Sequence, residues 1–454
     1  MTGDSGSTAG TLVPMLREQG VEGVVLAYVD VSGVNRIKTV PVAALERTAV
    51  WGVGMSPVFD TFLSNDVPIK ATYLGGPDGD LRLVPDLGAL VPLAAQPGWA
   101  WAPVDRYTQD HEPYVACSRL FAQRMVERAR AVGVTYRMGI EIEWAISEGT
   151  GDEFVPACVG PAYSMTRLTE LSDYAAELLA ALRAEGIEVQ QLHPEYSDGQ
   201  FEVSVAAADP VRAADDSVLV RQTIRAVSAQ HGLRVSFAPS VLVGHVGNGG
   251  HVHLSAWREG GNLLAGGDGR YGMTAAGESM LAGVLDALPA LQAIGAPSPA
   301  SYLRQLPSHW AGVYRCWGRE TRETAMRFIT GSAGDEGRAA NAEVKCVDLA
   351  ANPYLLAGAL LAASLAGLDA EATLPEEMVG DPAWHDEDEL ASRGVHRLPR
   401  SLDEAATAFA NSQLLRDALG VPLFDAILAV RRAEIERFEG AEPHEIAEAV
   451  RWVY

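Results

Sequence analysis

The sequence has few cysteines, no long apolar run and a shortage of positive charge, and each shortage excludes a class of protein. Its 454 residues include 4 cysteines, which form no Cys-x-x-Cys pair. We therefore expect reduced thiols and a cytoplasmic protein rather than a disulfide framework. The longest apolar stretch, residues 355–368, is too short to span a bilayer and predicts a buried helix. We find no secretory signal.

The deficit of basic residues bears on partners. Lys and Arg number 35 against 59 Asp and Glu, which gives a net charge of −24. Surplus negative charge repels phosphate backbones and anionic lipids, so we expect neither nucleic acid nor a membrane as a partner. The Walker loop Gly-x-x-x-x-Gly-Lys-Ser/Thr is also missing. Its absence argues against ordinary P-loop nucleotide binding.

What is present divides into two regions. Residues 12–107 mix glycines, prolines and short strand-like segments, including a hairpin at residues 30–41 with Gly33 at its turn, and predict a small β-rich domain. A polar segment, residues 109–113, reads as a linker. Residues 113–454 alternate helices and strands and become mostly helical toward the C-terminus. We therefore predict two domains, 12–107 and 113–454.

Four stretches of the larger region predict strands with charged or imidazole side chains on one face. Residues two apart in a strand point to the same side. Glu141 and Glu143 therefore share a face, as do His251, His253 and Ser255, and the opposite faces are apolar. The stretches are residues 137–146, 193–195 running into 199–202, 251–256 and 343–345. One face of a sheet thus gathers five glutamates and two histidines.

This collection of side chains favours a multi-metal site. Taken singly, a Glu-x-Glu or His-x-His pair is explained as well by a solvated sheet face. Many carboxylates in one cleft, however, require cations to neutralise them. Oxygen-rich sites with one imidazole suit Mg²⁺ or Mn²⁺ better than zinc. Several acids around two hard cations are typical of phosphoryl transfer from a nucleotide.

A run of arginines supplies candidate phosphate ligands. The guanidinium fork matches phosphate and carboxylate oxygens in pairs. Surface ion pairs are the alternative, which we favour for Arg315 and Arg319. The run consists of Arg304, Arg315, Arg319, Arg322 and Arg327.

In these motifs the chain resembles the glutamine synthetase family, and more closely its γ-glutamyl-amine ligase branch. The resemblance extends from Asp30-x-x-Gly33-x-x-Arg36-x-Lys38 to the C-terminal helices. It implies an α+β fold with an N-terminal β-grasp-like domain and a large α/β catalytic domain built on a curved antiparallel sheet. It also implies a homo-oligomer of two stacked hexameric rings, in which a neighbour's N-terminal domain completes each site.

The resemblance assigns roles to individual residues. The first metal falls to Glu143, Glu195 and Glu202. The second, which bridges to the ATP phosphates, falls to Glu141, His251 and Glu343. His253 and Ser255 match the family's nucleotide-contacting positions. Arg322 and Arg327 match the arginines that contact the transferring phosphate. The substrate glutamate matches Gly247 and Arg304.

Two departures concern the amine. Trp310 stands where glutamine synthetases have a flap glutamate, and Ser56 aligns with an aspartate of the N-terminal domain. Both carboxylates help to bind ammonium in the family. Their loss removes the negative pocket for a small cation, whereas an aromatic wall suits a larger amine through cation–π contact. Core packing is the alternative for Trp310.

A third departure concerns the acid. Lys345 replaces the family's arginine after Glu-Val, and Val246 replaces an asparagine beside the glutamate pocket. Lysine keeps the charge but loses the paired geometry of a guanidinium. A carboxylate other than glutamate is therefore an open alternative.

The resemblance as a whole implies an ATP-dependent acid–amine ligase. ATP would phosphorylate the γ-carboxylate of glutamate, or of a close analogue, and an organic primary amine would attack the acyl phosphate. Mg²⁺ or Mn²⁺, two or more per site, would serve as cofactor. Three alternatives remain: a glutamine synthetase that uses ammonia, which Trp310 disfavours, a ligase for another carboxylate, and a non-catalytic family member. The complete set of metal-ligand positions argues against the last.

Overall fold

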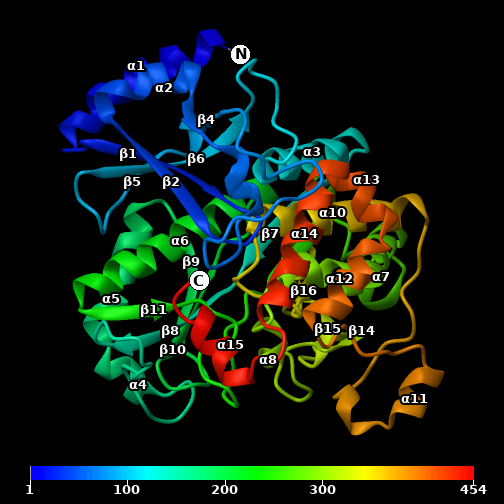
Figure 1. The fold of residues 1–454 in the computed structure, drawn as a ribbon. Coiled ribbons are helices and arrows are strands. Elements are labelled where there is room, and N and C mark those ends of the chain that lie inside the picture. Colours follow the sequence, from blue (N-terminus) through cyan, green and yellow to red (C-terminus); the bar gives the residue numbers. More distant parts are fainter. Residues whose placement is uncertain (1) are drawn as a thin grey trace.

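The computed structural model describes residues 2–454. Its N-terminal part is a sheet with the strand order β2-β1-β6-β4-β3, to which β5 adds beside β6. Helices α1 (Thr2–Glu18) and α2 (Leu45–Trp51) cover one face (Figure 1). Val13, Leu16 and Leu45 pack there against Leu26 and Leu83 of the strands. The strands are β1 (Gly23–Val29), β2 (Asn35–Pro41), β3 (Val53–Met55), β4 (Leu81–Pro85), β5 (Val91–Pro92) and β6 (Trp99–Tyr107).

A hairpin is formed by β1 and β2, which pair antiparallel on either side of a turn at residues 30–34. The predicted range 30–41 contains the turn and β2, whereas the first strand of the hairpin lies before it. Asp30 is fully buried there and accepts hydrogen bonds from Val34 N (3.0 Å) and Arg36 Nε (2.7 Å). Gly33 has φ +82°, and a Cβ at this position would lie 1.9 Å from Ala350 O. Glycine is therefore required where the hairpin tip meets the larger region.

The larger region contains two further sheets, with the orders β11-β8-β10-β9 and β13-β12-β16-β15-β14; β7 pairs with the free side of β12. All pairs are antiparallel except β14 with β15. The strands are β7 (Thr135–Ile140), β8 (Ile142–Glu148), β9 (Val189–Pro194), β10 (Gln200–Val205), β11 (Leu233–Ser236), β12 (Val252–Arg258), β13 (Gly261–Asn262), β14 (Tyr314–Arg319), β15 (Thr324–Ile329) and β16 (Asn341–Val344).

The prediction of one strand over residues 137–146 in a single sheet is wrong. The chain leaves one sheet at the end of β7 and enters the other at the start of β8, and Glu141 lies between them. The backbone N–H of Glu141 donates to His251 O (2.9 Å), so hydrogen bonding continues through the crossing. At Glu141 the chain therefore connects the two sheets on the side where their charged and imidazole side chains lie.

Helices pack behind the sheets. The apolar residues 355–368 lie in α10 (Pro353–Asp369), which is buried on almost all sides, as predicted, and contacts α3 and α7. None of the helices in residues 2–454 is long and apolar enough to cross a membrane. The other helices are α3 (Ser118–Ala131), α4 (Met165–Glu170), α5 (Ser172–Ala184), α6 (Pro210–Gln230), α7 (Ala275–Gly295), α8 (Ser301–Arg304), α9 (Glu336–Ala339), α11 (Glu387–Ser392), α12 (Leu402–Ala410), α13 (Gln413–Leu419), α14 (Val421–Arg437) and α15 (Pro443–Val450).

Arg119 on α3 ties the N-terminal sheet to α6, and its removal should destabilise the protein. Its guanidinium, 4% exposed, lies within 2.7–2.9 Å of Asp86, Asp105 and Asp215. Arg119→Ala would leave Asp215 buried without its cation, so we expect a loss of about 3–5 kcal/mol of stability. Thermal unfolding followed by circular dichroism measures the loss. Arg338→Ala, which removes an 81% exposed side chain, is the control and should leave the midpoint unchanged. Equal midpoints for the two variants would contradict this account.

Candidate active site

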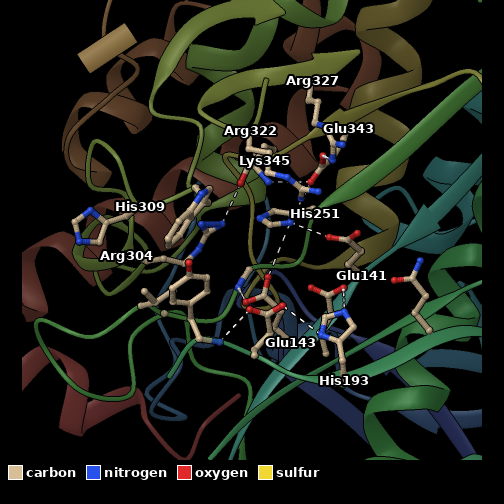
Figure 2. Close-up of a pocket in the computed structure, with 18 of the residues that line it drawn as sticks. Glu141, Glu143, His193, His251, Arg304, His309, Arg322, Arg327, Glu343 and Lys345 are labelled. Carbon is tan, nitrogen blue, oxygen red and sulfur yellow. Dashed lines mark hydrogen bonds and ion pairs between the residues drawn. The ribbon is translucent and has the colours of Figure 1, made fainter. Parts of the chain in front are cut away.

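A cavity of about 600 Å³ lies where the two sheets of the larger region meet (Figure 2). It brings together most of the residues that the sequence singled out. Those that line it are Glu141, Glu143, Glu195, Glu202, Val246, Gly247, His251, His253, Arg304, Trp310, Arg322, Arg327, Glu343 and Lys345.

Strand register assembles the first acidic cluster. Glu143 of β8 lies opposite Glu202 of β10, and Glu202 lies opposite His193 of β9. His193 Nδ1 is 3.4 Å from Glu195 Oε1, and its Nε2 is 3.5 Å from Glu202 Oε1. Donor atoms of His193, Glu195 and Glu202 all lie within 4.8 Å of one another. His193 was not among the predicted site residues, although strand alternation places it on the same face as Glu195.

Glu143 belongs to this cluster through charge. Its Oε2 accepts hydrogen bonds from Gly249 N (2.9 Å) and Gln200 Nε2 (3.1 Å). Burial, followed by repulsion from Glu202 and Glu195, raises the pKa of Glu143 well above its usual range. Carboxylates in this arrangement are charged together only beside a cation. The donor set, oxygen with one imidazole, therefore suits a hard divalent ion.

The second cluster joins three strand ends. Donor atoms of Glu141, His251 and Glu343 lie within 4.8 Å of one another. His251 Nδ1 is 2.9 Å from Glu141 Oε2 and 3.3 Å from Glu343 Oε1. His253 Nε2 is 3.0 Å from Glu141 Oε1. Burial opposes the charge of Glu141, but the hydrogen bonds to the two imidazoles outweigh it and hold the pKa of Glu141 well below its usual range.

Basic side chains surround Glu343. Lys345 Nζ lies 2.9 Å from Glu343 Oε1, and Arg327 Nη1 lies 3.2 Å from Oε2. Burial would raise the pKa of Glu343, but Lys345 and the two histidines lower it to about 2. The register explains the grouping, because Glu343 lies between His253 and Arg327 on neighbouring strands. The carboxylate is therefore charged and available as a ligand.

Arg304 and Gly247 form a close-packed corner of the cavity. Arg304 Nη2 donates to Lys345 O (3.0 Å) and Val347 O (2.8 Å), whereas its buried Nε has no hydrogen-bond partner among the described residues. A Cβ on Gly247 would lie 2.0 Å from Pro239 O and 3.0 Å from Arg304 Cγ. Any larger side chain at position 247 would displace Arg304, so the position of the arginine depends on the glycine.

Trp310 lies on the rim of the cavity rather than in the apolar core, half-buried, with its N–H donating to Glu323 Oε1 (2.9 Å). Two predicted residues do not line this cavity. Ser56 caps the short 3₁₀ helix Pro57–Thr61 and accepts from Val58 N (3.3 Å). Ser255 is buried and accepts from Trp257 Nε1 (2.9 Å).

The chain matches a known protein family over most of its length. Residues 115–448 match the family "Glutamine synthetase, catalytic domain". The chain is 60% identical over 442 residues to "Gamma-glutamylpolyamine synthetase GlnA3" of Streptomyces coelicolor. The alignment covers 97% of this chain and 95% of that protein. It is 26% identical over 442 residues to "Glutamate--methylamine ligase" of Methyloversatilis universalis, covering 92% and 93%.

Solved structures agree with these relatives. "Crystal structure of novel glutamine synthase homolog" superposes with a TM-score of 0.86 at 31% identity and covers 96% of this chain and 99% of that one. "GmaS/ADP complex-Conformation 1" superposes with a TM-score of 0.82 at 26% identity, covering 95% and 97%.

Proposed function

The chain belongs to the glutamine synthetase family and is a carbon–nitrogen ligase of that family; from this premise we propose that it joins the γ-carboxylate of glutamate to a primary amino group of a polyamine. Ligases of this family use ATP and divalent metal ions. The observation that carries the proposal is the aromatic Trp310 on the rim of a cavity with two acidic clusters. A relative named for polyamine glutamylation supports the substrate class.

We assign the metal sites as the sequence suggested and add one residue. Glu143, Glu195 and Glu202 form one site, with His193 beside them, and the second cluster forms the other. Magnesium or manganese, when bound, would neutralise and orient phosphate oxygens. The ligands of the second site are Glu141, His251 and Glu343.

We assign the remaining lining residues to the binding of ATP and of glutamate. Arg322 and Arg327 hold the transferring phosphate, and His253 faces the nucleotide. Arg304, fixed against Gly247, offers its guanidinium to the α-carboxylate of glutamate. Lys345 is paired with Glu343. Its ammonium therefore supports the metal ligand, and Arg304 remains the main anchor for the acid.

The reaction then follows from carboxylate chemistry. A carboxylate is a poor electrophile, and transfer of the γ-phosphoryl group of ATP gives it a good leaving group. The amine nitrogen forms the amide bond to the acyl carbon, phosphate departs, and the amine loses a proton. The arginines stabilise the charge on the phosphoryl oxygens.

We extend the proposal, by analogy with the family, to the assembly and location of the protein. Ser56 does not line the cavity of its own chain, and it would reach a site only from a neighbouring copy. We therefore propose the family's two stacked hexameric rings, in a cytoplasmic enzyme.

Phosphate release tests the activity. The protein is given ATP, glutamate and Mg²⁺ or Mn²⁺, together with a linear polyamine, ethanolamine, methylamine or ammonia, and products are confirmed by mass. We expect turnover with the polyamine and little with ammonia. Preferred turnover with ammonia would instead identify the protein as a glutamine synthetase. Phosphate release with an acid other than glutamate would show that glutamate is not the acid substrate.

Metal ions should stabilise the protein. A ligand that binds only the folded state at a hundred times its Kd adds about 2.7 kcal/mol. Adding Mg²⁺ or Mn²⁺ to chelator-treated protein should therefore raise the thermal midpoint by several degrees. Potassium chloride at equal ionic strength is the control. A midpoint that responds equally to both salts would contradict the metal assignment.

A further inference from the structure

A second aromatic side chain faces Trp310 across the rim. Tyr196 follows Glu195 directly, lines the cavity and is 44% exposed. Its ring centroid lies 4.3 Å from that of Trp310, with an angle of 35° between the planes. Tyr163 approaches Tyr196 edge-on at 6.2 Å. The aromatic surface therefore continues beyond Trp310 and passes beside the first acidic cluster.

The backbone holds both rings in place. Tyr196 N donates to Glu195 Oε2 (3.0 Å), which ties the ring to a proposed metal ligand. On the opposite side, Ser308 and Trp310 have φ values of 58° and 55°, a left-handed conformation that side-chain-bearing residues seldom adopt. The hydroxyl of Ser308 donates to the buried Asp381 (2.6 Å). With the bond from Trp310 N to Glu323, this fixes the loop in its strained form.

Such a surface recognises a particular kind of amine. Aromatic faces attract ammonium groups, and they also bury methylene groups. Ammonia has no alkyl surface and methylamine has a single carbon, so neither can bury a methylene chain on the two rings. A linear diamine places one nitrogen in the cavity and extends its alkyl chain and second ammonium over the rings.

We propose that Tyr196 is a specificity-determining residue, whose ring forms with Trp310 the surface that binds the alkyl chain and distal ammonium of the substrate. The inference rests on the proposed function, and adds to it a residue and a dependence on chain length. The rings, rather than a carboxylate, then separate long diamines from ammonia.

A series of α,ω-diamines of increasing length, with ammonia and methylamine, tests this assignment. For Tyr196→Leu we expect KM for the long diamines to rise about tenfold, the loss of one cation–π contact. Their kcat and the KM values for glutamate and ATP should stay within about twofold, and the chain-length dependence should flatten. Tyr196→Phe keeps the ring and should behave as the wild type. Trp51→Leu, which removes a 57% exposed ring on α2, is the matched control.

Three outcomes would overturn the assignment. A wild-type chain-length dependence in Tyr196→Leu would show that the ring does not touch the substrate. An equal loss of kcat for every amine, ammonia included, would show that Tyr196 only supports Glu195. An equal rise in KM for the long diamines in Tyr196→Phe and Tyr196→Leu would show that the hydroxyl, and not the ring, contacts the substrate. If the wild type turns over no diamine, the proposed function fails first, and that result is distinct from all three.

Discussion

Replacing Glu343 by alanine should abolish ATP turnover. The carboxylate is a proposed ligand of the second metal, and its pKa of about 2 keeps it charged at any working pH. It also neutralises Lys345, and both side chains are 3% exposed. Removing it deletes a metal ligand and leaves a buried ammonium unpaired. Because a metal contributes several kcal/mol of transition-state stabilisation, we expect kcat to fall by at least about a thousandfold.

A second variant of Glu343 distinguishes the loss of its charge from the loss of its volume, and a variant of an exposed glutamate is the control. Glu343→Gln keeps the size of the side chain and loses only its charge, so it should lose activity nearly as far as Glu343→Ala while folding better. Glu177→Gln neutralises a 58% exposed carboxylate on α5 and should retain full activity. Phosphate release measures turnover, and Mn²⁺ binding by electron paramagnetic resonance should weaken in both Glu343 variants. Wild-type turnover and metal affinity in Glu343→Gln would refute the second metal site.

The side chains proposed as metal ligands could be singled out from the sequence because strand alternation is a local property, and the structure brings them to one cavity. Alternation groups His251 with His253 and Glu141 with Glu143 from sequence spacing alone. All four side chains do line the cavity, although the strand is interrupted at Glu141. The partners across strands depend on register, which is set by pairing between distant segments. The opposition of Glu143, Glu202 and His193 could therefore not be derived from the sequence.

The single-sheet prediction failed for a related reason. Nothing in residues 137–146 signals that pairing changes partner at Glu141, because both halves alternate in the same way. The change is decided by β12 on one side and β10 on the other. A helix start, by contrast, carries a local signal in the sequence. Asp209 precedes Pro210 at the start of α6, and its side chain accepts a hydrogen bond from Val211 N (3.1 Å).

The aromatic pair lay beyond sequence reasoning altogether. Tyr196 and Trp310 are far apart in the chain, and neither belongs to a periodic pattern. Their contact depends on the left-handed turn at residues 308–310, which Glu323 and Asp381 hold from two other segments. A role for Trp310 could be suggested from the residue it replaces, whereas its partner required the structure.

Replacing Trp310 by glutamate should move the amine preference from the proposed polyamine substrate toward ammonia. The change restores a carboxylate at the flap position where glutamine synthetases carry one, and a negative group at the rim attracts a small cation. It also removes the ring that contacts Tyr196, so long diamines lose part of their binding surface. We expect kcat/KM for a long diamine to fall about tenfold, from one lost cation–π contact, and that for ammonia to rise by a similar factor.

Trp310→Leu distinguishes the two effects. It removes the ring without adding charge, so it should lose the diamine preference and gain no ammonia activity. The backbone N–H of residue 310 donates to the side-chain carboxylate of Glu323, and this bond does not depend on the side chain at position 310, so it remains available in both variants. Burial raises the pKa of Glu323, and repulsion between its carboxylate and one introduced at position 310 would raise the pKa of the introduced group as well. The ratio of ammonia use in Trp310→Glu to that in the wild type should therefore grow with pH as the introduced carboxylate ionises. An amine profile identical to the wild type in both variants would show that the tryptophan ring has no part in choosing the amine.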